Sequence, residues 1–99
     1  MVKIYDISVH HLPRMDWLWG SKCDPFVLFD FDEKKSKTEV IKNTFDAKFT
    51  DEMFFDVENV EEVGDMSIIV KDWDLGSSDE VVGSAMLPKP DIREFLSLP

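Results

Sequence analysis

The sequence has few cysteines, few basic residues and no long hydrophobic run. Its single cysteine, Cys23, excludes an intrachain disulfide, and its start lacks the basic and apolar pattern of a secretion signal, so a cytoplasmic protein is predicted. No segment reaches the about 20 apolar residues of a membrane span. With 11 Lys and Arg against 21 Asp and Glu, the formal net charge is −10, which repels nucleic acid. These shortages disfavour a disulfide-stapled fold, an integral membrane segment and a nucleic-acid partner.

Short runs of β-branched and aromatic residues are abundant instead. The 99 residues, 43% of them hydrophobic, suit one domain over residues 1–99. Turn-forming residues separate the runs, and this spacing predicts an antiparallel β-sandwich or barrel. The expected strands are Val2–His10, Pro25–Phe31, Lys37–Asn43, Glu52–Glu58, Met66–Asp72 and Val81–Leu87.

Carboxylates are concentrated in two of the expected loops. One loop contains Asp16 and Asp24, and the segment KDWDLGSSDEVVG adds Asp72, Asp74, Asp79 and Glu80. Like charges at this density repel one another, and oxygen-only ligands in loops suit Ca²⁺, whereas zinc prefers His or Cys. Asp72 and Asp74 are two residues apart at a strand end, where both side chains can face one ion. The alternative is that these acidic loops are simply solvated.

Three segments together resemble a C2 domain, the calcium- and phospholipid-binding β-sandwich. MDWLWGSKCDPFVLF is similar to the family's first calcium loop, KTEVIKNTFDAKFTDEMFFDV to its middle segment, and IIVKDWDLGSSDEVVGSAML to its third loop. The resemblance implies an all-β, antiparallel Greek-key sandwich of C2 type. Fewer strands are expected here than the family has, so one or two C-terminal strands are predicted to be lacking. The open sheet edges would then pair with another protein or a second copy.

The resemblance also implies a set of calcium ligands. It assigns Asp16, Asp24, Asp72 and Asp74 as carboxylate ligands and places a weaker oxygen ligand at Ser77. The last acidic ligand falls at Glu80, where the family usually has Asp. Asp79, which directly precedes it, is the alternative.

Large apolar residues lie on the same two loops, where the family inserts side chains into membranes. The resemblance implies a membrane-binding wedge of Trp17, Leu18 and Trp19, supported by Leu75 from the other loop. The alternative is that one of the two tryptophans packs back against the sandwich. Trp73, between two expected ligands, is interpreted as structural.

Three lysines form the one basic cluster of the sequence, at Lys34, Lys35 and Lys37. The corresponding strand of C2 domains can bind phosphoinositide headgroups, which makes these lysines candidates for that role. The alternative is a solvated strand end, because acidic residues flank the cluster.

The function implied is a calcium-dependent module that binds anionic phospholipid, as in signalling or membrane trafficking. Such a protein would be cytoplasmic, and peripheral at membranes when calcium is bound. A C2-like protein–protein interaction module that needs no calcium is the alternative. An enzyme is not expected, because the sequence has neither a nucleotide-binding loop nor a Ser/His/Asp set.

Overall fold

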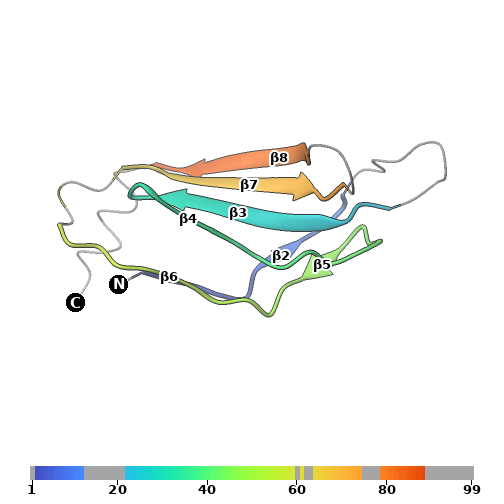
Figure 1. Cartoon of the computed structure of the whole chain (residues 1–99), viewed down its shortest axis with the longest axis horizontal. Coiled ribbons are helices and arrows are strands. Elements are labelled where there is room, and N and C mark those ends of the chain that lie inside the picture. Colours follow the sequence, from blue (N-terminus) through green and yellow to red (C-terminus); the bar gives the residue numbers. More distant parts are fainter. Residues whose placement is uncertain (1, 13–21, 60, 62–63, 75–78, 89–99) are drawn as a thin grey trace.

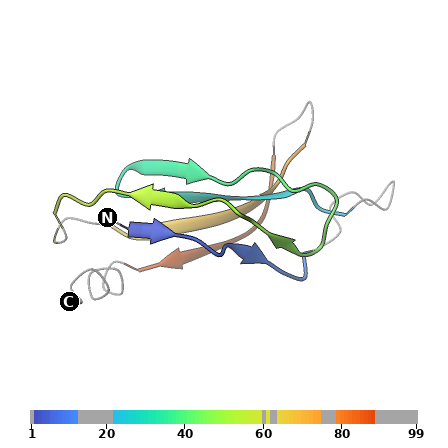
Figure 2. The same cartoon turned by 90° about the horizontal axis from the view of Figure 1, so that it is seen from below.

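The structure, a computed structural model, describes residues 2–12, 22–59, 61, 64–74 and 79–88. Apart from a 3₁₀ position at Glu61, the regular structure among them consists of β-strands, which form two layers (Figures 1 and 2). The described part of the chain contains no helix with the length and hydropathy of a membrane span. The strands are β1 (Val2–Ile4), β2 (Ser8–Val9), β3 (Pro25–Phe31), β4 (Lys34–Lys37), β5 (Ala47–Lys48), β6 (Met53–Phe55), β7 (Met66–Asp72) and β8 (Glu80–Leu87).

The first layer is an antiparallel four-stranded sheet in the order β4-β3-β7-β8. Its two central strands, β3 and β7, have the bounds that the sequence predicted. They are paired from Pro25 opposite Asp72 to Asp30 opposite Ser67. Because the strands run in opposite directions, the start of β3 and the end of β7 lie at the same end of the sheet.

The second layer consists of two short antiparallel pairs, β1 with β6 and β2 with β5. The predicted strand Val2–His10 is divided because Asp6 has a φ of 52°, outside the extended region. β6 is shorter than the predicted Glu52–Glu58, and β5 was not expected from the sequence. β5 has only two residues, too few for an alternating pattern to be recognised in the sequence.

The predicted strand Lys37–Asn43 is wrong. The regular strand is β4, which ends at Lys37, because Asp32 (φ 54°) and Glu33 (φ 61°) form a two-residue hairpin turn that returns the chain early. After Lys37, the chain remains beside β3 through irregular hydrogen bonds. Thr38, 4% exposed, turns its side chain inward, and its hydroxyl accepts a hydrogen bond from the Val27 amide at 2.9 Å.

The hydrophobic core lies between the two layers. Phe31 of β3 and Phe55 of β6 meet edge to face across it, with ring centroids 5.7 Å apart. Its buried members are Val2, Ile7, Val27, Phe29, Phe31, Ala47, Phe49, Met53, Phe55 and Met66. None comes from β8, which lies beyond β1 at one side in Figure 2. The expected all-β antiparallel sandwich is confirmed, with β8 at its least covered side.

Candidate metal centre

The two acidic segments meet where β3 begins and β7 ends. The Asp24 amide donates a hydrogen bond to Asp72 Oδ1 at 2.8 Å, and the Trp73 amide donates to the Asp24 carbonyl at 2.9 Å. Residues 48 positions apart in sequence are thus adjacent in space. The structure therefore brings Asp24 and Asp72 together, whereas Asp16 lies outside the described residues.

The other acidic residues of the second loop lie at the same end of the sheet. Glu80 is opposite Asp72 in the pairing of β7 with β8. The Asp74 amide donates a hydrogen bond to Asp79 Oδ1 at 3.0 Å, which closes the base of the intervening loop. The Asp79 carboxylate therefore has a structural role in addition to its candidate role as a ligand. Ser77 and Leu75 lie outside the described residues.

A turn at residues 43–46 fixes the first loop where it joins β3. The Asn43 amide donates a hydrogen bond to Asp24 Oδ1 at 2.6 Å, and Asn43 Oδ1 accepts one from the Lys22 amide at 3.2 Å. Asn43 was not predicted as a site residue, because the sequence pattern places it at the end of an expected strand. Its φ of 56° is a conformation in which asparagine is enriched, so an asparagine turn was the available signal.

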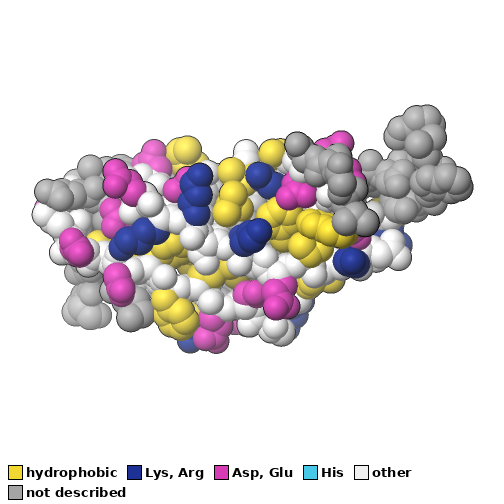
Figure 3. Space-filling view, in the orientation of Figure 1, with side chains coloured by type: hydrophobic (Ala, Val, Ile, Leu, Met, Phe, Trp, Pro, Cys, Tyr) yellow, Lys and Arg dark blue, Asp and Glu magenta, His cyan; other side chains and the backbone are white. Residues whose placement is uncertain are grey.

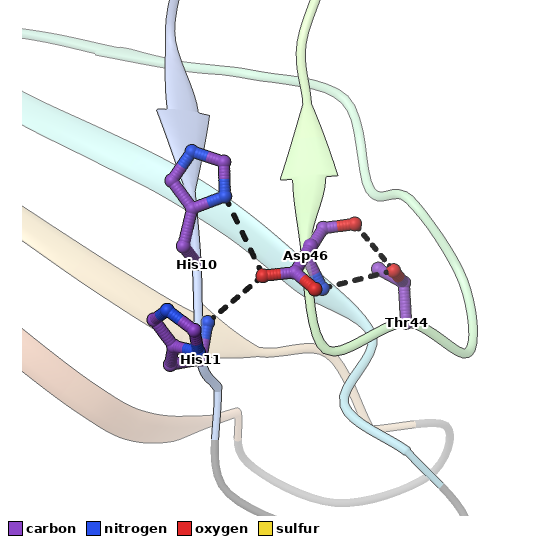
Figure 4. A network of polar contacts seen from close by, with 4 residues as sticks. All are labelled: His10, His11, Thr44 and Asp46. Carbon is purple, nitrogen blue, oxygen red and sulfur yellow. Dashed lines mark hydrogen bonds and ion pairs between the residues drawn. The ribbon is translucent and has the colours of Figure 1, made fainter.

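The same turn also holds the chain before the first loop (Figure 4). Asp46 Oδ1 accepts a hydrogen bond from the His11 amide at 3.0 Å and lies 3.4 Å from His10 Nδ1. The His11 amide, followed by the His10 side chain, holds the pKa of Asp46 below its usual value. Thr44 holds Asp46 in place, because its hydroxyl donates a hydrogen bond to the Asp46 carbonyl and accepts one from the Asp46 amide. Both stems of the first loop are therefore anchored on one turn.

Cys23 lies beneath the carboxylates and is fully buried. Its Sγ is 3.6 Å from Asp72 Oδ1, to which the thiol donates a hydrogen bond. Burial, followed by the negative charge of Asp72, raises the pKa of the Cys23 thiol from 9.0 to about 12. The thiol therefore stays protonated at neutral pH, which removes a thiolate ligand and leaves oxygen donors.

This donor set fits a hard cation such as Ca²⁺. Asp24, Asp72 and Asp79 each accept a backbone amide at Oδ1. Those bonds orient the carboxylates, and the described residues place no hydrogen bond on the Oδ2 atoms. Within the described ranges, no group of three or more His, Cys, Asp or Glu side chains surrounds a single point. A complete site would therefore need donors from the remaining parts of the two loops.

The predicted lysine cluster is divided between two faces of β4. Lys34 is paired with the buried Phe31 and donates from Nζ to the Asp56 carbonyl at 2.7 Å, toward the second layer. Lys35 and Lys37 alternate with it and lie on the outer face. Basic side chains cross the middle of that side of the molecule, interspersed with acidic ones (Figure 3).

Lys37 lines an open cavity of about 480 Å³ beside the metal centre. Phe26 and Trp73 contribute aromatic rings to it, and Glu39 and Asp79 contribute carboxylates. Lys42 Nζ lies 4.7 Å from the centroid of the Trp73 ring. Trp73 is thus fixed both through its backbone to Asp24 and through its ring, and the cavity has mixed charge.

Fold and site together define a β-sandwich with acidic loop stems gathered at one end. Residues 1–96 match the family model of the C2 domain, and the chain belongs to this family.

Several known proteins are similar to this chain. A probable serine/threonine-protein kinase of Dictyostelium discoideum is 30% identical over 95 residues, which are 96% of this chain and 9% of the kinase. A C2 domain of plant Extended Synaptotagmin 1 has a TM-score of 0.75 at 22% identity, covering 90% of this chain and 68% of that one. The calcium-bound pair of C2 domains from Extended Synaptotagmin 2 has a TM-score of 0.76 at 21% identity, covering 94% and 35%. The structural similarities establish the fold, and the kinase match is confined to a small part of that protein.

Proposed function

We propose that this chain is a calcium-dependent module that binds anionic phospholipid at the cytoplasmic surface of membranes. Membership of the C2 family supports membrane binding in general. The observation that carries the calcium dependence is the hydrogen bond between the Asp24 amide and Asp72 Oδ1, which joins the two acidic loops. Asp16, Asp24, Asp72, Asp74 and Ser77 are the proposed ligands, with Glu80 or Asp79 as the last.

The charge of the chain supplies the switch. At a net charge of −10, the protein is repelled by anionic headgroups, and the carboxylates of the metal centre contribute to that repulsion. A pair of Ca²⁺ ions would contribute roughly four positive charges there and coordination sites for lipid phosphate oxygens. Asp24 and Asp72 are already oriented by backbone amides, so they need little rearrangement to act as ligands.

Trp17, Leu18, Trp19 and Leu75 form the proposed apolar wedge. They belong to the loops whose stems meet at the metal centre, so neutralising the carboxylates brings these side chains to the lipid interface. A tryptophan at the interface buries its rings and keeps its N–H hydrated.

The test is co-sedimentation with phosphatidylserine/phosphatidylcholine vesicles in calcium or in chelator. Wild type is expected to pellet in calcium only. Asp72→Asn with Asp74→Asn is expected to pellet no more in calcium than in chelator. Asparagine retains an oxygen acceptor at Asp72 for the Asp24 amide, so the fold is preserved. Trp17→Ala with Trp19→Ala is expected to lower vesicle affinity at least about tenfold through lost apolar burial, while calcium binding persists.

The matched control is Asp56→Asn with Glu58→Gln, which makes the same change of charge beyond β6, at the opposite end of the sandwich (Figure 1). Its pelleting should resemble wild type. Equal pelleting of the wild type in calcium and chelator would contradict the proposal and favour the calcium-independent interaction module.

The lysines of β4 have a different place in this proposal. Lys34 is engaged with the Asp56 carbonyl, and the cavity beside Lys37 is also lined by Glu39 and Asp79, which oppose an anion. Phosphoinositide binding by Lys34, Lys35 and Lys37 therefore stays a prediction. The position of these lysines on an edge strand supports a different role, in which their charges prevent another strand from pairing with β4.

A further inference from the structure

The edges of the two layers differ in how they are protected against pairing with another strand. β4, one edge of the four-stranded sheet, has Lys at three of its four positions, and lysine is a common deterrent to edge pairing. The pairs of the second layer are two or three residues long and interrupted at Asp6. Short, bent edges also resist pairing.

Within the part of the chain that the structure describes, β8, the other edge of the four-stranded sheet, has none of these protections. It is the longest described strand, with eight residues, and its only charged residue is Glu80 at the beginning. Val81 is 60% exposed, Met86 62% and Leu87 41%. Hydrophobic side chains reach the surface along the upper side of Figure 3, where β8 runs in Figure 1.

The irregularity within β8 places its two most exposed apolar side chains on one face. Val81 is paired with Lys71 and Met86 with Ser67, and the register shifts between these two points. Lys71 and Ser67 alternate with Met66, Ile68 and Val70, which pack on the core. Val81 and Met86 therefore both lie on the outer face of the sheet.

We infer that the free edge of β8 is an interface between two copies of this chain, in which the two β8 strands pair antiparallel about a two-fold axis. When the whole strand is aligned, Val81 of one copy lies opposite Met86 of the other, so each exposed apolar residue covers its counterpart. The two Glu80 residues then lie at opposite ends of the pair, about 24 Å apart, beyond the screening length at physiological salt.

A second copy fits this edge better than other arrangements of the same surfaces. A net charge of −10 repels copies that approach through charged surfaces, whereas the paired β8 strands face each other with uncharged residues from Val81 to Leu87. Pairing β8 with β4 of another copy would be head to tail and would not close. The two-fold pairing closes after two copies and makes one eight-stranded sheet.

The pairing has a consequence that rests on the proposed function. β8 begins at the metal centre, so antiparallel pairing directs the two metal centres in opposite directions. A dimer of this form would hold two membrane surfaces apart at its ends rather than bind one surface twice.

The test is the mass in solution by sedimentation equilibrium from about 10 µM to about 500 µM, in 150 mM NaCl with chelator and without lipid. The wild-type mass is expected to rise from monomer toward dimer. Met86→Lys, which adds a charge to the edge at an exposed position, should remain monomeric, and Thr50→Lys, an equal charge change at an exposed residue outside β8, should behave as wild type. A monomeric wild type throughout, or equal dimerisation of Met86→Lys, would overturn the inference independently of any result with calcium.

A second measurement addresses the opposed metal centres. Calcium-dependent clustering of vesicles, followed by light scattering, should be lost in Met86→Lys while its pelleting with vesicles is unchanged. Equal clustering by Met86→Lys and Thr50→Lys would refute the opposed arrangement.

Discussion

The pKa of the buried Cys23 thiol depends on the carboxylates of the metal centre. The thiol is enclosed beneath Asp24 and Asp72, and its pKa is raised to about 12 by burial and then by Asp72. In the unfolded chain the thiol ionises near its ordinary value, so the unfolded state loses its proton first as the pH rises. The stabilisation is therefore complete below about pH 9 and is lost as the pH rises toward the folded value.

Replacing Cys23 with alanine should remove this pH dependence. Alanine leaves a small cavity and lowers the free energy of unfolding at neutral pH. The difference between wild type and Cys23→Ala should shrink by about 1 kcal/mol between pH 9 and pH 10, because only the wild type has a thiol to ionise on unfolding. Urea denaturation in chelator at a series of pH values measures this difference in unfolding free energy. If the unfolding free energies of the two proteins change in parallel with pH, ionisation of the Cys23 thiol does not cause the pH dependence.

Single residues also decide how the first loop is held. Asn43 and Asp46 anchor its two stems, although neither was predicted as a site residue. Their role depends on contacts with Lys22, Asp24 and His11, which are between 19 and 35 positions away. Local spacing carries no information on such contacts.

Among the elements, the β3–β4 hairpin contains the clearest local strain. Asp32 and Glu33 both have positive φ, a conformation that costs a residue with a Cβ about 1 kcal/mol or more. This turn has no glycine, although glycine is favoured in two-residue hairpin turns in which both residues have positive φ.

Glu33→Gly should therefore stabilise the protein. Relief of the strained conformation outweighs the added entropy of glycine in the unfolded chain, and we expect a gain of about 0.5–1 kcal/mol in the free energy of unfolding. Glu52→Gly, at an exposed position without positive φ, should instead be neutral or destabilising. Denaturant titration compares the two, and a loss of stability in Glu33→Gly would show that the turn is not strained.

At the scale of the whole molecule, the net charge of −10 and the carboxylates of the metal centre couple stability to cations. Ca²⁺ that binds only the folded state should stabilise it by about 2.7 kcal/mol at a hundred times the dissociation constant. For a chain of this size, that corresponds to an increase of roughly 10–20 °C in Tm.

Thermal unfolding without lipid tests this coupling. Asp74→Asn should raise the Tm in chelator, because it relieves repulsion, and should reduce the shift caused by calcium. Sodium chloride at about 0.5 M should reduce the difference in Tm between wild type and Asp74→Asn in chelator, because salt screens the repulsion. A Tm of the wild type that calcium leaves unchanged would contradict calcium binding, whatever the behaviour with membranes.

The sequence by itself determined the central strands β3 and β7, the all-β class and the acidic character of the two loops. Each of these follows from local alternation, composition or motif, which neighbouring residues carry. Only the tertiary structure decided that Asp24 and Asp72 touch, that Lys34 faces away from Lys35 and Lys37, and that β8 is the least protected edge among the described strands. These features depend on the pairing and register of strands distant in sequence, and the energy that selects them comes from burial across both layers rather than from any one segment.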